Sequence, residues 1–162
     1  MSAVGFRVRE GGRADLPQVI ALERAAVEAP HWAEAEYGAI VDAQDGGVRR
    51  CLFVAETEDR VVGFAVGKVI GARPGSLAEL ESVAVDAAAR RGGVGRALCV
   101  TIADWVREQG AETLELEVRA ASAGAIALYT GLGFVVVGRR RAYYQGPADD
   151  AVLMQLELGE GK

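Results

Sequence analysis

Residues 83–96, with the sequence VAVDAAARRGGVGR, decide the fold of this chain. The apolar residues 83–85 predict the end of a strand, and the glycines and arginines after them predict the start of a helix. The first N–H groups of a helix have no partner within the helix and lie at the positive end of its dipole, so they bind anions. Glycines let an anion approach the backbone, and arginines add charge. The residues expected to form this anion site are Arg90, Arg91, Gly92, Gly93, Val94, Gly95 and Arg96.

This glycine loop differs from the two commonest phosphate-binding motifs. It lacks the spaced glycines and the Lys-Ser/Thr end of a Walker loop. It also lacks the full Gly-x-Gly-x-x-Gly pattern of a dinucleotide fold, and it lies in the middle of the chain. Taken alone, the loop is also compatible with a tight helix entry beside incidental arginines.

Hydrophobic periodicity predicts the other elements. Asp15, followed by Pro17, is expected to cap the first helix. A helix is expected to follow the glycine loop and to end at Gly110, because apolar residues recur at helical spacing there. The other predicted helices are 17–28, 33–43 and 123–129, and the predicted strands are 6–9, 51–55, 61–70, 80–85, 114–118, 134–137 and 151–158. This order predicts one α/β domain over residues 1–162, with a mixed, largely antiparallel sheet.

Composition narrows the classes of function. The chain has 162 residues, of which 51% are hydrophobic, and a formal net charge of −5. An acidic chain disfavours nucleic-acid binding and suits a cationic partner such as an amine or a basic peptide, although such a charge also serves solubility alone. Cys51 and Cys99 lie far apart without metal-type spacing, so we expect reduced core thiols and no metal site. No signal peptide or membrane span is evident, and a cytoplasmic location is expected.

Several further motifs resemble one enzyme family. The glycine loop is followed by residues 116–119 (LEVR), 125–129 (AIALY) and 131–134 (GLGF). Together they resemble the GNAT acetyltransferase superfamily, and residues 29–32 (APHW) and 140–144 (RRAYY) are similar to its ribosomal-protein-alanine N-acetyltransferase branch. The resemblance is dense from Glu79 to Leu156.

The resemblance implies a GNAT fold in which two neighbouring strands splay apart and hold acetyl-CoA between them. The backbone of Val83, Ala84 and Val85 would align the pantetheine arm, and the glycine loop would hold the pyrophosphate. Ser122 stands where the family has an asparagine that contacts the cofactor, and Ser82 stands where the branch often has another asparagine.

The same resemblance implies a general base at Glu117 and a general acid at Tyr129. An ammonium must lose a proton before it attacks a thioester, and Glu117 can accept that proton directly or through a water. A tyrosine hydroxyl can give a proton to the departing thiolate. No covalent enzyme intermediate is required. Glu79 and Glu81 on the preceding strand are rival candidates for the base, and Glu117 could instead be a solvated strand residue.

For the acetyl acceptor, the resemblance implies the N-terminal alanine of a small-subunit ribosomal protein. Trp32, Tyr143 and Tyr144 are candidates for the peptide-facing wall, because aromatic residues are favoured at recognition surfaces. Two alternatives stay open: a GNAT enzyme that acetylates a small amine, such as a polyamine, an amino acid or an antibiotic, and a non-catalytic acyl-CoA sensor.

Overall fold

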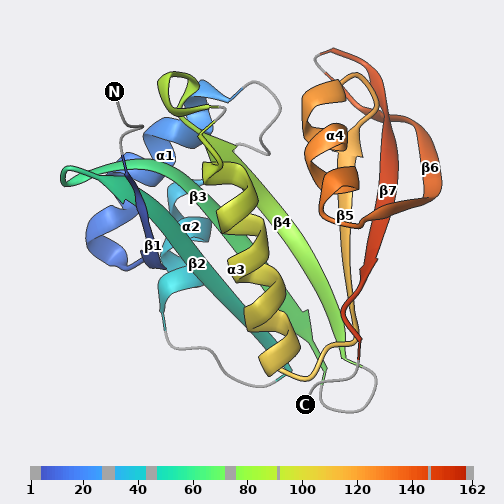
Figure 1. The fold of residues 1–162 in the computed structure, drawn as a ribbon, viewed down its shortest axis with the longest axis horizontal. Coiled ribbons are helices and arrows are strands. Elements are labelled where there is room, and N and C mark those ends of the chain that lie inside the picture. Colours follow the sequence, from blue (N-terminus) through green and yellow to red (C-terminus); the bar gives the residue numbers. More distant parts are fainter. Residues whose placement is uncertain are drawn as a thin grey trace.

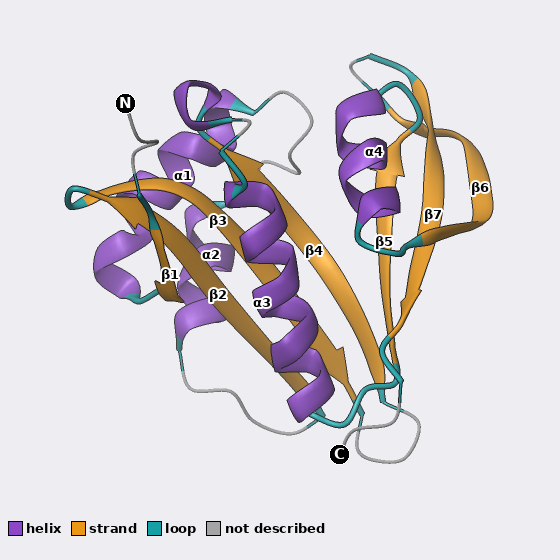
Figure 2. Cartoon of the chain, viewed as in Figure 1, coloured by secondary structure: helices purple, strands orange, loops and turns teal. Residues whose placement is uncertain are grey.

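The computed structural model describes residues 5–26, 32–42, 47–71, 76–90, 92–145 and 147–159. Within these ranges the chain forms an α/β fold of seven strands and four α-helices (Figures 1 and 2). The strands are β1 (Arg7–Glu10), β2 (Val48–Thr57), β3 (Arg60–Ile70), β4 (Leu77–Val85), β5 (Thr113–Arg119), β6 (Val135–Tyr144) and β7 (Asp149–Glu157). The helices are α1 (Leu16–Ala25), α2 (Glu34–Val41), α3 (Val94–Glu108) and α4 (Ala123–Gly131).

The strands form one mixed sheet in the order β1-β2-β3-β4-β5-β7-β6. Neighbouring strands are antiparallel except for β4 and β5, which are parallel. Helix α3 packs across β2, β3 and β4 on one face, α1 and α2 cover the other face, and α4 lies beside β5 and β7 (Figure 1). The predicted element order and the mixed, mostly antiparallel sheet are therefore confirmed.

Two apolar clusters hold the helices on the sheet. On one face, α3 buries Val94, Leu98, Ile102 and Val106, which recur every four residues as the periodicity predicted. On the other face, Val19 of α1 and the α2 residues Tyr37 and Ile40 pack against β2 and β3. Each cluster removes apolar surface from water and so stabilises the packing of the helices on the sheet.

The two cysteines are free and buried in the described structure, as expected for core thiols. Burial raises the pKa of Cys51 and of Cys99 to about 12. Neither thiol forms a nucleophilic thiolate near neutral pH.

Element boundaries differ from the prediction where pairing extends a strand. β6 continues to Tyr144 through an arginine run that sequence reasoning left outside any strand. The register of β6 against β7 is irregular after Val136 and after Arg140. These irregularities break the alternation of apolar and polar residues, so the sequence pattern does not reveal the full strand. The sequence also predicts that Pro30 ends the first helix, that Gly46-Gly47 ends the second and that Pro74-Gly75 forms a turn. Pro30, Gly46 and Pro74-Gly75 lie outside the described residues.

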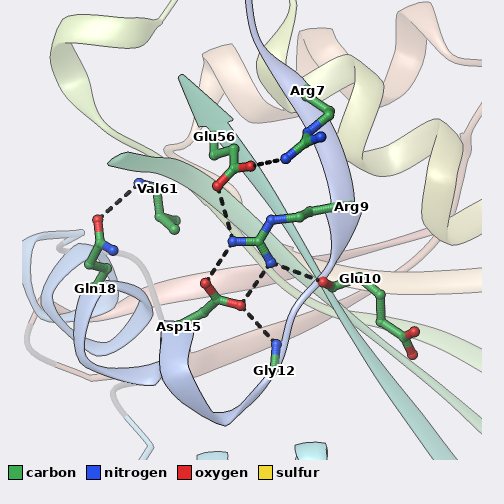
Figure 3. Close-up of polar contacts among 8 residues, drawn as sticks. All are labelled: Arg7, Arg9, Glu10, Gly12, Asp15, Gln18, Glu56 and Val61. Carbon is green, nitrogen blue, oxygen red and sulfur yellow. Dashed lines mark hydrogen bonds and ion pairs between the residues drawn. The ribbon is translucent and has the colours of Figure 1, made fainter. Parts of the chain in front are cut away.

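A polar cluster ties the N-terminal strand to the first helix (Figure 3). The Asp15 carboxylate accepts two hydrogen bonds from Arg9, at 2.9 and 2.8 Å, and one from the Gly12 amide at 2.8 Å. Arg9 also binds Glu56 of β2 at 3.0 Å. The sequence predicted that the Asp15 side chain would cap α1; it makes no such cap and instead closes the turn that precedes the helix.

We predict that Asp15→Asn lowers the free energy of unfolding by about 1–3 kcal/mol at pH 7, because it removes charge-assisted hydrogen bonds from a nearly buried group. The hydrogen bonds from Arg9 lower the pKa of Asp15. Its contribution is therefore complete above the unfolded-state pKa of about 3.9 and is lost as the pH falls through the lower folded-state pKa.

Urea unfolding at pH 7 and at about pH 3 tests this expectation, with the difference between wild type and variant shrinking at the lower pH. Asp104→Asn is the control, because Asp104 is exposed and pairs only with Arg107 one turn away on α3. We expect its effect to stay within about 0.5 kcal/mol. An equal loss in both variants would contradict a special role for Asp15.

Candidate active site

The parallel pair β4 and β5 separates after a short contact. Their register contains Ala78 opposite Leu114 and Glu79 opposite Glu115. Beyond these pairs β4 continues along β3 and β5 continues along β7, so the two strands diverge (Figures 1 and 2). Beyond the two pairs, the edges of β4 and β5 that face each other carry N–H and C=O groups without a partner on the other strand. Such groups favour the binding of an extended ligand that can form hydrogen bonds with them.

A cleft of about 770 Å³ occupies this divergence. It is lined by the C-terminal half of β4, the start of α3, the end of β5 and one side of α4. Nine of the residues predicted to contact the cofactor line it: Val83, Ala84, Val85, Arg90, Gly93, Val94, Gly95, Arg96 and Ser122. Gly92 is not among the lining residues, and Arg91 lies outside the described part of the chain.

The glycine loop gives the cleft an electropositive end. Gly93 is the residue before α3 and has φ of 86°, a left-handed conformation that side chains rarely adopt. No side chain caps this helix start, and the first helical hydrogen bond runs from the Ala97 amide to the Gly93 carbonyl at 3.0 Å. The amides of residues 94–96 are therefore available to an anion.

Arginines add charge to the same end. Arg90 and Arg96 line the cleft. The neighbouring carboxylate of Asp86 is engaged elsewhere, because it accepts hydrogen bonds from Arg60 at 2.7 Å and from the Ala88 amide at 2.9 Å. The hydrogen bond from Arg60 is the largest effect that lowers the pKa of Asp86, and the charge of Arg90 adds a smaller one.

Helix α4 forms an apolar wall. The helix is rich in apolar residues, yet none of its described residues is buried. Ala125, Leu128 and Tyr129 line the cleft instead. A Cβ atom on Gly95 would lie 3.3 Å from Leu128, so glycine at this position keeps the passage between α3 and α4 open. The residues present fit a pyrophosphate at the α3 start joined to an extended arm between the strands, which are the two parts of coenzyme A that the family binds.

Both predicted catalytic residues line this cleft, from different elements. Glu117 comes from β5 and Tyr129 from α4. The Glu117 side chain is 26% exposed, and Arg140 of β6 lies 3.1 Å from it. The Tyr129 ring packs against Phe134 with 5.7 Å between ring centroids. The fold thus brings the two residues to one cavity, as the resemblance implied.

The two rival glutamates differ in their surroundings. Glu81 lines the cleft, but Arg50 Nε lies 2.9 Å and Lys68 Nζ 3.5 Å from its carboxylate. Glu79 does not line the cleft. Burial raises the pKa of Glu79, and the charges of Glu81 and Glu117 add to this effect while Lys68 opposes it. Two carboxylates, Glu81 and Glu117, therefore line the cleft. The cation that pairs with Glu117, Arg140, is more exposed than Arg50 or Lys68, which pair with Glu81.

The aromatic residues proposed for a peptide wall divide into two groups. Tyr144 lines the cleft, with the Arg119 guanidinium 4.5 Å from its ring centroid. Trp32 and Tyr143 do not line it. Trp32 instead packs against Tyr37, with centroids 5.4 Å apart, so its direct place in the wall is not supported.

The sequence predicted no role for Arg50, or for Arg119 and Arg140 within the LEVR and RRAYY motifs. Each comes from a different strand and meets its partner only through the sheet. Arg119 donates to the carbonyls of Pro147 and Gln145, at 2.8 and 3.1 Å, and so fixes the β6–β7 hairpin beside the cleft. No local sequence signal distinguishes these arginines from solvated ones.

Comparison with known proteins agrees with the geometry. The model of the Acetyltransferase (GNAT) family matches residues 17–134. The [ribosomal protein bS18]-alanine N-acetyltransferase of Escherichia coli strain K12 is 36% identical over 146 residues, which cover 89% of this chain and 92% of that protein.

Solved structures give the same result. The crystal structure of the Escherichia coli ribosomal-protein-S18-alanine N-acetyltransferase superposes with a TM-score of 0.78 at 31% identity, over 98% of this chain and 97% of that one. Arabidopsis thaliana NAA60, solved in complex with acetyl-CoA, shares the fold with a TM-score of 0.81 at 18% identity, over 94% and 98% of the two chains.

The chain belongs to the GNAT acetyltransferase family. It is an acetyl-CoA-dependent N-acetyltransferase, and acetyl-CoA is its cosubstrate. In the described part of the chain, no helix combines the length and the apolar character needed to cross a membrane.

We predict that Gly93→Ala weakens coenzyme A binding by about fivefold to tenfold, because a side chain at positive φ costs roughly 1 kcal/mol and shifts the amides at the α3 start. Isothermal titration calorimetry with coenzyme A measures the change. Gly131→Ala is the control, because Gly131 has open space around it and does not line the cleft. Intact affinity in Gly93→Ala would contradict the assignment of the loop.

Proposed function

We propose that this chain transfers the acetyl group of acetyl-CoA to the N-terminal alanine of a small-subunit ribosomal protein. The observation that carries the choice of acceptor is the 36% identity to the Escherichia coli enzyme named for bS18 alanine acetylation, which spans nearly the whole of both chains. The carboxylates of Glu81 and Glu117, which line the cleft, support a cationic acceptor.

The donor half of the reaction rests on backbone groups. Acetyl-CoA supplies an activated thioester when it binds. The amides at the start of α3, with Arg90, Arg91 and Arg96, hold the pyrophosphate by charge-assisted hydrogen bonds. The free edge of β4 at Val83, Ala84 and Val85 aligns the arm, because its N–H and C=O groups have no partner on β5. Ser122 immediately precedes α4 and lines the cleft on the side of β5, where its hydroxyl can contact the cofactor.

The acceptor half rests on two side chains. An N-terminal ammonium has a pKa of about 7.7–8.0, so one proton must leave before the nitrogen attacks. Glu117 takes that proton, directly or through a water, and Tyr129 gives a proton to the sulfur as the carbon–sulfur bond breaks. A second proton leaves the nitrogen after the carbon–nitrogen bond has formed and restores Tyr129 through solvent. The acetyl group passes directly to nitrogen, and no enzyme nucleophile takes part.

Two further proposals concern the extent of the domain and the location of the protein. Residues 1–162 form a single GNAT domain, which is supported by the membership of β6 and β7 in the same sheet as the matched residues 17–134. A cytoplasmic location is also proposed, because ribosomal proteins are made there.

An acceptor panel tests the function. The protein is incubated with acetyl-CoA and alanine-initiated peptides with basic sequences, the same peptides with a blocked N-terminus, polyamines, amino acids and aminoglycosides, and thiol release is followed. We expect turnover of the free alanine peptides alone. Turnover of small amines without peptides would overturn the ribosomal acceptor, and tight coenzyme A binding without any turnover would favour a sensor.

We predict that Glu117→Gln lowers kcat by about 10²- to 10⁴-fold with little change in coenzyme A affinity, because it removes the proton acceptor and leaves the donor half intact. Tyr129→Phe is expected to lower kcat in the same way. Glu81→Gln is the comparison, since Glu81 is already engaged by Arg50 and Lys68. A larger loss of kcat in Glu81→Gln than in Glu117→Gln would transfer the role of base to Glu81.

A further inference from the structure

Arg140 of β6 is the cation that pairs with the proposed base. Its Nε lies 3.1 Å from Glu117 Oε2. No other ion pair to Glu117 occurs among the described residues. We propose that Arg140 holds the place of the acceptor's ammonium in the free enzyme and gives way to it on binding. This inference rests on the proposed function, and it makes Arg140 a residue that determines acceptor specificity.

The pair is loosely made. The Arg140 side chain is 58% exposed, whereas Glu117 is 26% exposed. Glu117 Oε2 is buried and accepts no hydrogen bond from the described residues, so the contact is an ion pair without hydrogen-bond alignment. An exposed arginine in such a contact contributes little to stability and is displaced at small cost.

The neighbouring pair shows the contrast. Arg50 pairs with Glu81 through a side chain that is only 13% exposed. Its guanidinium also binds Glu36 at 2.8 Å and lies 5.3 Å from the Trp32 ring centroid. Arg50 is therefore held from several sides, and an incoming ammonium cannot replace it at Glu81 without breaking all of these contacts. Glu117 is the carboxylate in the cleft whose partner can leave.

Arg140 also has a second contact that it can keep after leaving Glu117. Its guanidinium lies 5.4 Å from the ring centroid of Tyr143, which is 47% exposed. An arginine over an aromatic face is attracted by the ring quadrupole. If the Arg140 side chain rotates and keeps this stacking, its guanidinium moves away from Glu117 but stays in contact with the Tyr143 ring instead of becoming fully hydrated.

Arg140 pairs with Ala151 of β7, and Asp150 holds the backbone that follows it. The register of β6 and β7 is irregular between Arg140 and Tyr144, and Ala142 there has φ of 51°. Asp150 holds this strained turn by accepting the Ala142 amide at 2.8 Å and Arg139 Nε at 2.9 Å. The backbone hydrogen bond from Ala142 lowers the pKa of Asp150, which keeps the anchor charged.

The exchange has a consequence for specificity. Arg140 and an acceptor ammonium are both cations, and they compete for one partly buried carboxylate. An uncharged group, such as an acetylated N-terminus, cannot replace the arginine without leaving Glu117 unpaired. Arg140 thus weakens the binding of every acceptor, because its ion pair with Glu117 must first break. Only a cationic acceptor replaces that ion pair with one of its own.

The test compares Arg140→Met, Arg140→Lys and Arg141→Met in steady-state assays on an alanine-initiated peptide. Removing the competitor should lower the KM for the peptide by about twofold to fivefold, the size expected for a weak exposed ion pair. The KM for acetyl-CoA should not change. Arg140→Lys should restore the wild-type KM, because it restores the cation.

Arg141→Met is the matched control. It removes the same charge one residue further along β6, and Arg141 makes no ion pair to Glu117 in the described structure. An equal fall in KM in this variant would attribute the effect to overall charge and would overturn the exchange. A raised or unchanged KM in Arg140→Met would overturn it as well.

A binding cycle isolates Glu117. The affinity of the peptide for the coenzyme A complex is measured by calorimetry in Glu117→Gln, with and without Arg140→Met. The gain from Arg140→Met should disappear in the Glu117→Gln background, because the neutral amide binds neither cation strongly. A gain that persists there would show that Arg140 acts elsewhere.

The outcomes for the inference and for the proposed function are distinguishable. If the wild type acetylates small amines and not peptides, the ribosomal acceptor fails while the same variants test Arg140 on those amines. If peptides are turned over and the KM values do not follow Arg140, the exchange alone fails. If no amine is turned over, both are overturned.

Discussion

The separation of β4 from β5 is the constraint on which the rest of the structure depends. The two strands share their register only at Ala78–Glu79 and Leu114–Glu115, and each then follows its other neighbour. The divergence leaves strand edges whose hydrogen-bonding groups require a partner. It also determines where α3 begins, because the chain leaves β4 at the widest part of the gap and enters the helix there (Figure 1). The cleft, its anion site and its apolar wall all follow from this one parting of strands.

The two walls of the cleft use different chemistry. The donor wall is built largely from backbone groups, namely the β4 edge and the α3 amides, and glycines keep them accessible. Such a wall binds phosphate and an extended arm whatever acceptor is used. The acceptor wall is built from charged side chains on β4, β5 and β6, whose partners come from across the sheet. In the proposed function, acceptor choice depends on long-range contacts between strands, and donor choice depends on a short local motif.

The ion pairs of Glu81 and Glu117 differ in how deeply their arginines are buried, and this difference gives the two pairs different roles. Arg50 is nearly buried between Glu81, Glu36 and Trp32, and this arrangement joins α2 to the sheet. Arg140 stands at an exposed edge strand and reaches Glu117 from outside. A buried ion pair resists separation because it would leave a charge without a partner, whereas an exposed one exchanges partners readily. The same residue types thus make a structural link in one place and a replaceable contact in the other.

The sequence by itself determined the element order, the strand–glycine loop–helix unit and the family. These features are local: periodicity, glycines and a loop motif are complete within about twenty residues. A resemblance in its motifs also predicted Glu117 and Tyr129 as catalytic residues, and the fold brings both to one cleft. Only the tertiary structure decided that β6 runs through the arginines to Tyr144, that Tyr144 rather than Trp32 or Tyr143 lines the cleft, and that Arg140 meets Glu117. The reason is that strand irregularities and ion pairs between residues distant in sequence depend on the register of the assembled sheet, and no local pattern encodes that register.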